Sequence, residues 1–177
     1  NSTSTTRDRG RRLPIGGGGM TEIRNLHPDP RCLKERGALN GSSRANGEKW
    51  RYERNADASN ATVWAFQPLT NVQMRGMVLY VRITSATQAV IDNLDIEQTA
   101  TIVRRNGWVA ARVGDDNKGN HRLYLFRGPF VLQEVGCYSP EDWEQLYALY
   151  QRGDIQFPWV AGPRDATTAG QVGPWEL

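Results

Sequence analysis

Residues that commonly carry catalysis are few in this sequence. Its 177 residues include two histidines, His27 and His121, and two cysteines, Cys32 and Cys137. Neither histidine lies near a G-x-S-x-G or H-E-x-x-H pattern, which would place a nucleophile or a metal beside a base. The cysteines lack the spacing of a metal site, so the sequence predicts two reduced thiols, with one disulfide between them as the alternative. We therefore expect no catalytic residue, no metal and no cofactor, and the chain is not expected to be an enzyme.

Acidic residues form two small groups, at 92–97 and at 115–116. A pair of carboxylates could hydrolyse glycosides, and the oxygens of GDDNKGN (114–120) could hold calcium. That segment lacks the spacing and the late glutamate of an EF-hand loop. We interpret both groups as solvated surface. A hydrolase whose site is assembled in space around His121 or these carboxylates remains a third, weaker hypothesis.

The six tryptophans are many for a chain of this length. Aromatic rings usually fill cores, so most of them are expected to be buried. Trp108, beside a tight turn, and Trp175, near the end of the chain, are predicted to be exposed anchors. Exposed rings on a β-sandwich could stack on sugars, and Trp175 could press into a neighbouring subunit.

The first 19 residues, NSTSTTRDRGRRLPIGGGG, are basic and nearly free of apolar side chains. Residues 1–54 hold 12 Lys and Arg against 6 Asp and Glu, whereas the rest of the chain is net acidic. A segment of this composition buries too little apolar surface to fold alone. Arginine outnumbers lysine 19 to 3, which either reflects phosphate and carboxylate pairing or a GC-rich genome. The candidate subunit-contact or phosphate-contact residues are Arg7, Arg9, Arg11 and Arg12. Met20 leaves open that residues 1–19 are an added tag.

Short β-rich runs separated by turns dominate the rest of the sequence. Asn106-Gly107 joins two such runs and has the residues of a type I′ hairpin turn. The runs that follow are expected to continue this hairpin as a meander. Residues 85–96 fit either a short helix or an edge strand. The expected strands are 49–54, 62–67, 76–84, 98–105, 108–113, 121–126 and 130–136.

One helix is predicted at 139–152. Ser139 is a suitable N-cap and Pro140 suits the first helical position. An apolar stripe follows at helical spacing, and Gly153 can end the helix. The predicted fold class is mainly β, as an antiparallel sandwich, jelly roll or partly open barrel, with one C-terminal helix and a long extended N-terminal arm. The predicted organisation is a basic Gly/Arg-rich arm (1–48), a β-rich body (49–162) and an extended C-terminal tail (163–177).

These features favour a non-enzymatic structural subunit of a large assembly, whose arm clasps neighbouring subunits. The layout is analogous to small virion proteins (capsid, cement or head–tail) with basic arms, although no motif carries the analogy. The expected partners are other protein subunits, and nucleic acid through the N-terminal arginines. The alternative is a carbohydrate-binding or receptor-binding β-sandwich. No run approaches the roughly 18 apolar residues of a membrane span, and no signal peptide or membrane partner is expected.

Overall fold

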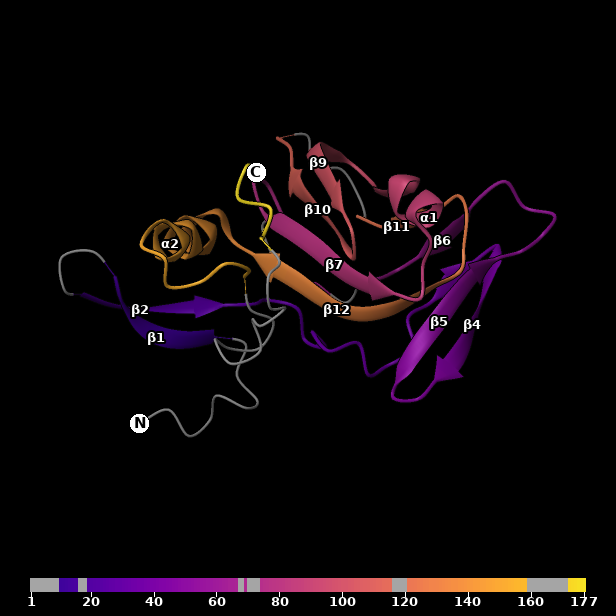
Figure 1. Ribbon diagram of the computed structural model, residues 1–177, viewed down its shortest axis with the longest axis horizontal. Helices are drawn as coiled ribbons and strands as arrows, with labels where there is room; N and C mark the ends of the chain where they lie inside the picture. The colour runs from indigo at the N-terminus through magenta and orange to yellow at the C-terminus, as the bar shows by residue number, and fades with distance from the viewer. Residues whose placement is uncertain (1–9, 16–18, 67–68, 70–73, 116–120, 159–171) are drawn as a thin grey trace.

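The computed structural model is built of two antiparallel sheets, two helices and a separate hairpin (Figure 1). It describes residues 10–15, 19–66, 69, 74–115, 121–158 and 172–177. The mainly β fold with a C-terminal helix is as predicted. The elements are β1 (Gly10–Ile15), β2 (Gly19–Arg24), β3 (Ala38–Leu39), β4 (Gly41–Asn46), β5 (Lys49–Arg54), β6 (Ala61–Val63), β7 (Val78–Thr84), α1 (Gln88–Asp92), β8 (Leu94–Ile96), β9 (Thr99–Arg105), β10 (Trp108–Val113), β11 (Leu123–Leu125), β12 (Phe130–Tyr138) and α2 (Pro140–Gln151).

Strand pairing is nested along the chain. Antiparallel pairs join β5 to β12, β6 to β11, and β7 to β10. Further pairing of β12 with β7 and of β11 with β8 completes one sheet of six strands and one of four. Their strand orders are β4-β5-β12-β7-β10-β9 and β3-β6-β11-β8. The three nested pairs give this two-sheet sandwich the strand pairing of a jelly roll, with β9 placed in the six-stranded sheet and with β4 and β3 added at the sheet edges.

The expected meander is wrong beyond its first hairpin. β9 and β10 do pair around Asn106-Gly107, but β11 then crosses to the four-stranded sheet and β12 returns to the six-stranded one. Strands of both sheets bury one face in the same core, so their apolar patterns are alike and do not reveal which sheet each one joins. The ambiguous segment 85–96 contains both alternatives, α1 followed by β8.

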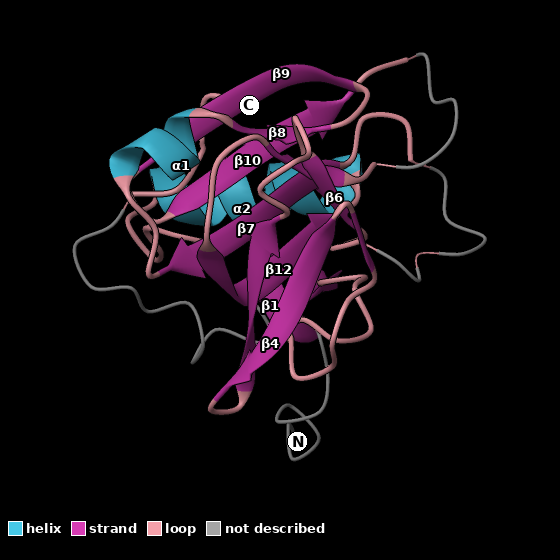
Figure 2. Cartoon of the chain, turned by 90° about the vertical axis from the view of Figure 1, so that its right-hand side faces the viewer, coloured by secondary structure: helices cyan, strands magenta, loops and turns pink. Residues whose placement is uncertain are grey.

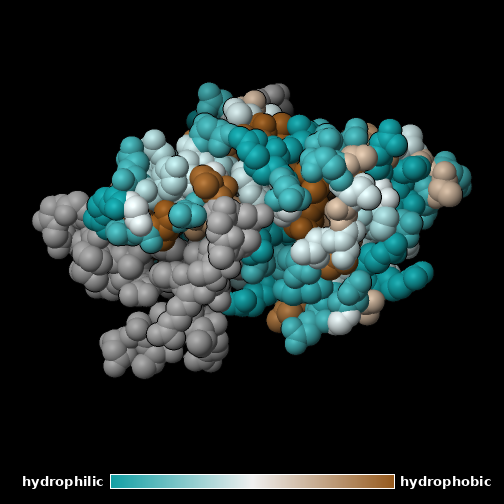
Figure 3. All heavy atoms as spheres, viewed as in Figure 1, coloured by the Kyte–Doolittle hydropathy of each residue, from teal (hydrophilic) through white to brown (hydrophobic). Residues whose placement is uncertain are grey.

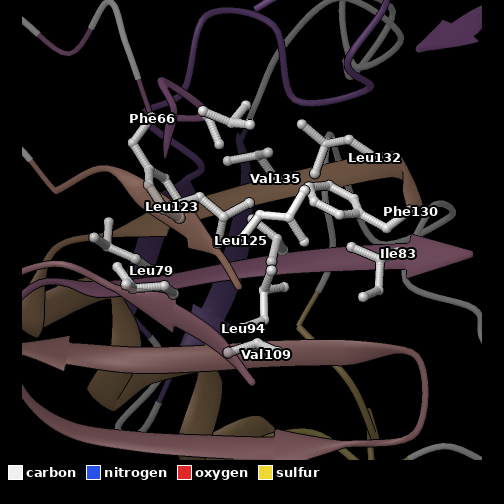
Figure 4. Close-up of a cluster of buried hydrophobic side chains, with 14 of the residues drawn as sticks. Phe66, Leu79, Ile83, Leu94, Val109, Leu123, Leu125, Phe130, Leu132 and Val135 are labelled. Carbon is white, nitrogen blue, oxygen red and sulfur yellow. The ribbon is translucent and has the colours of Figure 1, made fainter. Parts of the chain in front are cut away.

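The main core lies between the two sheets (Figure 4). It takes Leu79 and Val109 from the six-stranded sheet and Leu123 from the four-stranded sheet, all fully buried. A register shift in β12 between Leu132 and Glu134 changes the phase of its alternation. Because of this bulge, Leu132 and then Val135 both face the core although three positions separate them.

A second core covers the outer face of the six-stranded sheet. Alternate residues of β7 and β10, such as Tyr80 and Trp108, point to this side and pack under α2. Ser139 caps α2 by accepting a hydrogen bond from the Asp142 N–H at 3.1 Å. The buried residues of α2 are Trp143, Leu146 and Leu149. The molecule therefore has three layers, and Figure 2 views them from the end that carries β4.

Candidate functional site

The N-terminal arm enters the body at the end of β2. In its described part the arm is a two-stranded antiparallel hairpin of β1 and β2. Ile23 is fully buried in the second core. The Arg24 N–H donates to the Asp142 carboxylate at 3.2 Å, at the first turn of α2. Burial raises the pKa of Asp142, opposed by this hydrogen bond. These contacts attach the hairpin to α2 at one end of the molecule (Figure 1).

Beyond β2 the chain continues the six-stranded sheet along β12. The Leu26 N–H donates to the Cys137 carbonyl, and the Val135 N–H donates to the Pro30 carbonyl, both at 2.8 Å. The Asn25 side chain completes this edge, donating to the Val135 carbonyl at 3.1 Å and accepting from the Cys137 N–H at 3.0 Å. A side-chain amide carries both hydrogen-bond donors and an acceptor, so it can bond to a neighbouring strand as a backbone peptide group does. Asn25 therefore replaces a backbone partner of β12.

The predicted boundary of the arm at residue 48 falls inside folded structure. β4, within the expected arm, pairs with β5 from Gly41 to Asn46. Cys32 belongs to the main core and His27 is fully buried. The Asp29 N–H donates to His27 Nδ1 at 3.0 Å, so Nε2 carries the proton and donates to the Ala65 carbonyl at 2.9 Å. Sequence periodicity misses this segment because two of its buried residues, Asn25 and His27, are polar and bond the backbone.

The structure describes two of the four arginines proposed as contact residues of the arm. Arg11 and Arg12 lie in β1, where their Cα partners in β2 are Ile23 and Glu22. Arg7 and Arg9 lie outside the described residues.

The prediction that Trp108 is exposed is wrong. It is 1% exposed and packs edge-to-face on Phe157, with ring centroids 5.9 Å apart. The reason is the layer that α2 adds over β10. The uninterrupted apolar run WVAA is the sequence signal for a strand buried on both faces.

The prediction that Trp175 is an exposed anchor for a neighbour is also wrong. It is 8% exposed because residues 172–177 lie against α2 of the same chain. Its ring stacks on Trp143 and Tyr150, at centroid distances of 5.0 and 4.7 Å. Its Nε1–H donates to the Gln156 carbonyl at 2.7 Å. The rest of the predicted tail lies outside the described residues.

His121 and both cysteines are buried. His121, expected at the surface, is 6% exposed and its Nδ1 lies 3.1 Å from the Glu97 carbonyl oxygen. Cys32 and Cys137 are both free and buried, and burial raises the pKa of each thiol far above its usual value. Within the described part of the chain, no three His, Cys, Asp or Glu residues are grouped as a metal site would need.

A cationic surface lies on the outer face of the six-stranded sheet, the same face on which α2 packs at the other end of the molecule. Lys49 and Arg51 alternate along β5 on the face opposite to buried Tyr52. Arg44 of β4 lies directly across from Arg51. Arg82 of β7 pairs with Glu134 of β12 on the same face. We call Arg31, Arg44, Lys49, Arg51 and Arg82 the cationic face. The alternation in KWRYER was visible in the sequence, but the contribution of β4 was not.

An aromatic surface lies on the outer side of the four-stranded sheet. The Glu97 carboxylate accepts two hydrogen bonds from the Arg122 guanidinium, at 2.8 and 2.7 Å, and one from the Tyr124 hydroxyl at 2.8 Å. These bonds lower the pKa of Glu97 to about 2, chiefly through Arg122. The guanidinium also lies over the rings of Trp64 and Tyr124, and Tyr124 packs against Phe126, which is 40% exposed. Sequence analysis missed this group because Glu97 and Trp64 are distant in the chain from Arg122, Tyr124 and Phe126.

Comparison with known proteins finds no match. No protein-family model, no curated protein and no solved structure resembles this chain significantly. Among the described residues, no helix is long and apolar enough to cross a membrane.

Proposed function

We propose that this chain is a non-enzymatic structural subunit of a large assembly, of the kind that builds a virion (capsid, cement or head–tail protein). Its N-terminal arm clasps neighbouring subunits. The arginines of the arm face acidic surfaces of those subunits or packaged nucleic acid. The folded body forms the shell of the assembly, and the arm makes the contact between neighbouring subunits.

The observation that carries the proposal is the hairpin of β1 and β2. It is a separate sheet of two strands, each six residues long. An isolated two-stranded hairpin is only marginally stable in water. Each strand also has an outer edge that no described strand of this chain occupies. A strand from a neighbour would stabilise such a hairpin by satisfying its edge hydrogen bonds.

The jelly-roll body is compatible with the proposal but does not decide it. This architecture occurs in viral shells, and equally in lectins and other binding proteins. Fold alone is therefore no argument for function. The combination of a two-sheet body, a separate hairpin and a basic leading segment favours the assembly subunit.

The test is the mass of the full chain in solution, measured by light scattering at low and high salt together with the ratio of absorbance at nucleic-acid and protein wavelengths. We expect a large or salt-sensitive oligomer. Deletion of residues 1–19 should abolish it while circular dichroism and the unfolding midpoint of the body stay unchanged. A truncated chain that assembles normally would exclude the clasping arm.

The aromatic surface supports a second candidate, a carbohydrate-binding or receptor-binding module. Tyr124 and Phe126 are accessible rings beside the Arg122–Glu97 pair, a combination that can stack on a sugar and bond its hydroxyls. Binding of the chain to a panel of immobilised oligosaccharides tests this function. The Phe126→Ala variant should bind at least tenfold more weakly, and a panel without any binding sugar excludes a glycan ligand.

A further inference from the structure

Two arginines on the cationic face are paired in an unfavourable way. Arg44 and Arg51 are directly opposite each other in the β4–β5 register. Like charges in that position destabilise a sheet. Arg51 has a partner in Glu53, at 3.1 Å. No carboxylate in the described part of the chain pairs with Arg44, which is exposed. A like-charge pair that destabilises the fold is expected where the side chains bind a ligand instead of stabilising the sheet.

The rest of the face increases the positive charge. Arg82 pairs with Glu134, whose carboxylate also feels the charges of Lys49 and Arg31. The Lys49 ammonium donates to the Gln133 carbonyl at 2.9 Å and to the Arg31 carbonyl. The face therefore has five cations and two carboxylates, Glu53 and Glu134. The end of the molecule formed by β4 and β5 is also largely hydrophilic (Figure 3).

The geometry restricts the chemistry of a ligand. Four of the five cations stand on strands of the sheet, so the sheet fixes their spacing, whereas Arg31 lies in a turn. The aromatic residues of β5, Trp50 and Tyr52, belong to the core side and offer no ring for base stacking on this face. A surface with cations and without stacking rings contacts phosphates and carries no sequence information.

We propose that the cationic face binds the phosphodiester backbone of nucleic acid. The contact is electrostatic and independent of base sequence. In the proposed assembly, the arm arginines contact phosphates, and the cationic face adds further phosphate contacts on the body. The proposal rests on that assembly only for the biological source of the nucleic acid, because binding by an unassembled chain is measurable by itself.

The experiment measures fluorescence polarisation of labelled single-stranded RNA and DNA oligonucleotides with the full-length chain. All variants carry Arg7→Gln, Arg9→Gln, Arg11→Gln and Arg12→Gln. Nucleic-acid binding by the arm then does not mask binding by the cationic face. In that background, Arg44→Gln with Arg51→Gln should weaken binding at least tenfold at low salt. It should also reduce the slope of log affinity against log salt by about 1.4, since each phosphate contact on a single strand contributes about 0.7. Equal affinity for RNA and DNA is expected.

The matched control is Arg127→Gln with Arg152→Gln, which removes the same charge from exposed positions elsewhere. It should leave the slope unchanged. An equal loss in the control and the face variant would overturn the proposal, because net charge alone would then explain binding. So would an unchanged slope in the face variant, or competition by poly-glutamate as strong as by oligonucleotide.

Stability and assembly measurements separate this proposal from the assembly function. Removing Arg44 relieves a like-charge contact, so the unfolding midpoint of the face variant should stay equal or rise. A lowered midpoint would give these arginines a structural role and contradict the inference. The mass of the face variant without nucleic acid should match that of the unsubstituted chain. A lower mass with oligonucleotide binding intact would make the face a subunit contact and leave the assembly function standing.

Discussion

Glu97 shows how a single, partly buried ionic contact links stability to pH. Its carboxylate is held by Arg122 and Tyr124, and its pKa is lowered from 4.5 to about 2. A group with a lowered pKa in the folded state stabilises the fold fully above its unfolded pKa. That contribution is lost as the pH falls toward the folded pKa. Glu97 should therefore stabilise the protein above about pH 5 and contribute little near pH 2.

Urea unfolding of the wild type and of Glu97→Gln at several pH values measures this contribution. The wild type should be more stable at pH 6, and the difference should shrink steadily between pH 5 and pH 2. The same comparison in an Arg122→Gln background removes the main cause of the shift, so the pH dependence of the difference should be reduced there. A difference independent of pH would refute the role given to this ion pair.

Gly136 allows close packing between β12 and β7. Gly136 is paired with Tyr80, and a Cβ on it would overlap the fully buried Tyr80 ring. Gly136→Ala should therefore lower stability by about 2 kcal/mol or more, a typical cost of overpacking. Differential scanning calorimetry should show a drop of several degrees in Tm. Gly37→Ala is the control, because its Cβ would lie at an ordinary 3.6 Å from Trp64. Equal effects of the two substitutions would contradict this explanation.

At the scale of elements, the Asn25 segment acts as a short strand built partly from a side chain. Its amide satisfies the Val135 carbonyl and the Cys137 N–H, and it also accepts from the His27 N–H at 3.1 Å. Asn25→Ala would leave these buried groups unpaired, at about 1–3 kcal/mol for each unsatisfied group. We expect a loss of several kcal/mol and faster hydrogen exchange of the Cys137 amide.

The control for this substitution is Asn46→Ala, at an exposed position in β4. It should leave the Cys137 amide protected and the stability within about 0.5 kcal/mol of the wild type. Unchanged protection of Cys137 in Asn25→Ala would show that the side chain is not its partner.

Elements with local signals were predictable from the sequence. β5 begins at Lys49 and ends at Arg54 as expected, because its aromatic and charged residues alternate. The β9–β10 hairpin follows from Asn106-Gly107, and α2 follows from Ser139 and Pro140. Elements defined by distant partners were not predictable. Asn25 lacks any local pattern, and β4 reads as a polar linker until β5 pairs with it.

At the scale of the whole molecule, sequence analysis could predict a sandwich but not the outer layer of α2 and residues 172–177. That layer decides the burial of Trp108 and Trp175, and hence removes both as candidate anchors. The cationic face was not predictable either, because Arg44 and Arg51 become neighbours only through the register of β4 and β5. Residue types were informative about chemistry, whereas their juxtaposition required the fold.

The division between arm and body gives the last prediction. Ile23, Asn25 and His27 are fully buried, and residues 26–30 bond directly to β12. The described residues before 22 form β1 and the first half of β2, whose strand pairing is with each other. Deletion of residues 1–19 should therefore leave the unfolding midpoint within a few degrees of that of the full chain. Deletion of residues 1–30 should abolish cooperative unfolding, because it uncovers both α2 and the edge of β12. Thermal unfolding followed by circular dichroism distinguishes the two deletions. If the chain lacking residues 1–30 unfolds as cooperatively as the chain lacking 1–19, the arm ends later than Ile23 and the segment along β12 is dispensable.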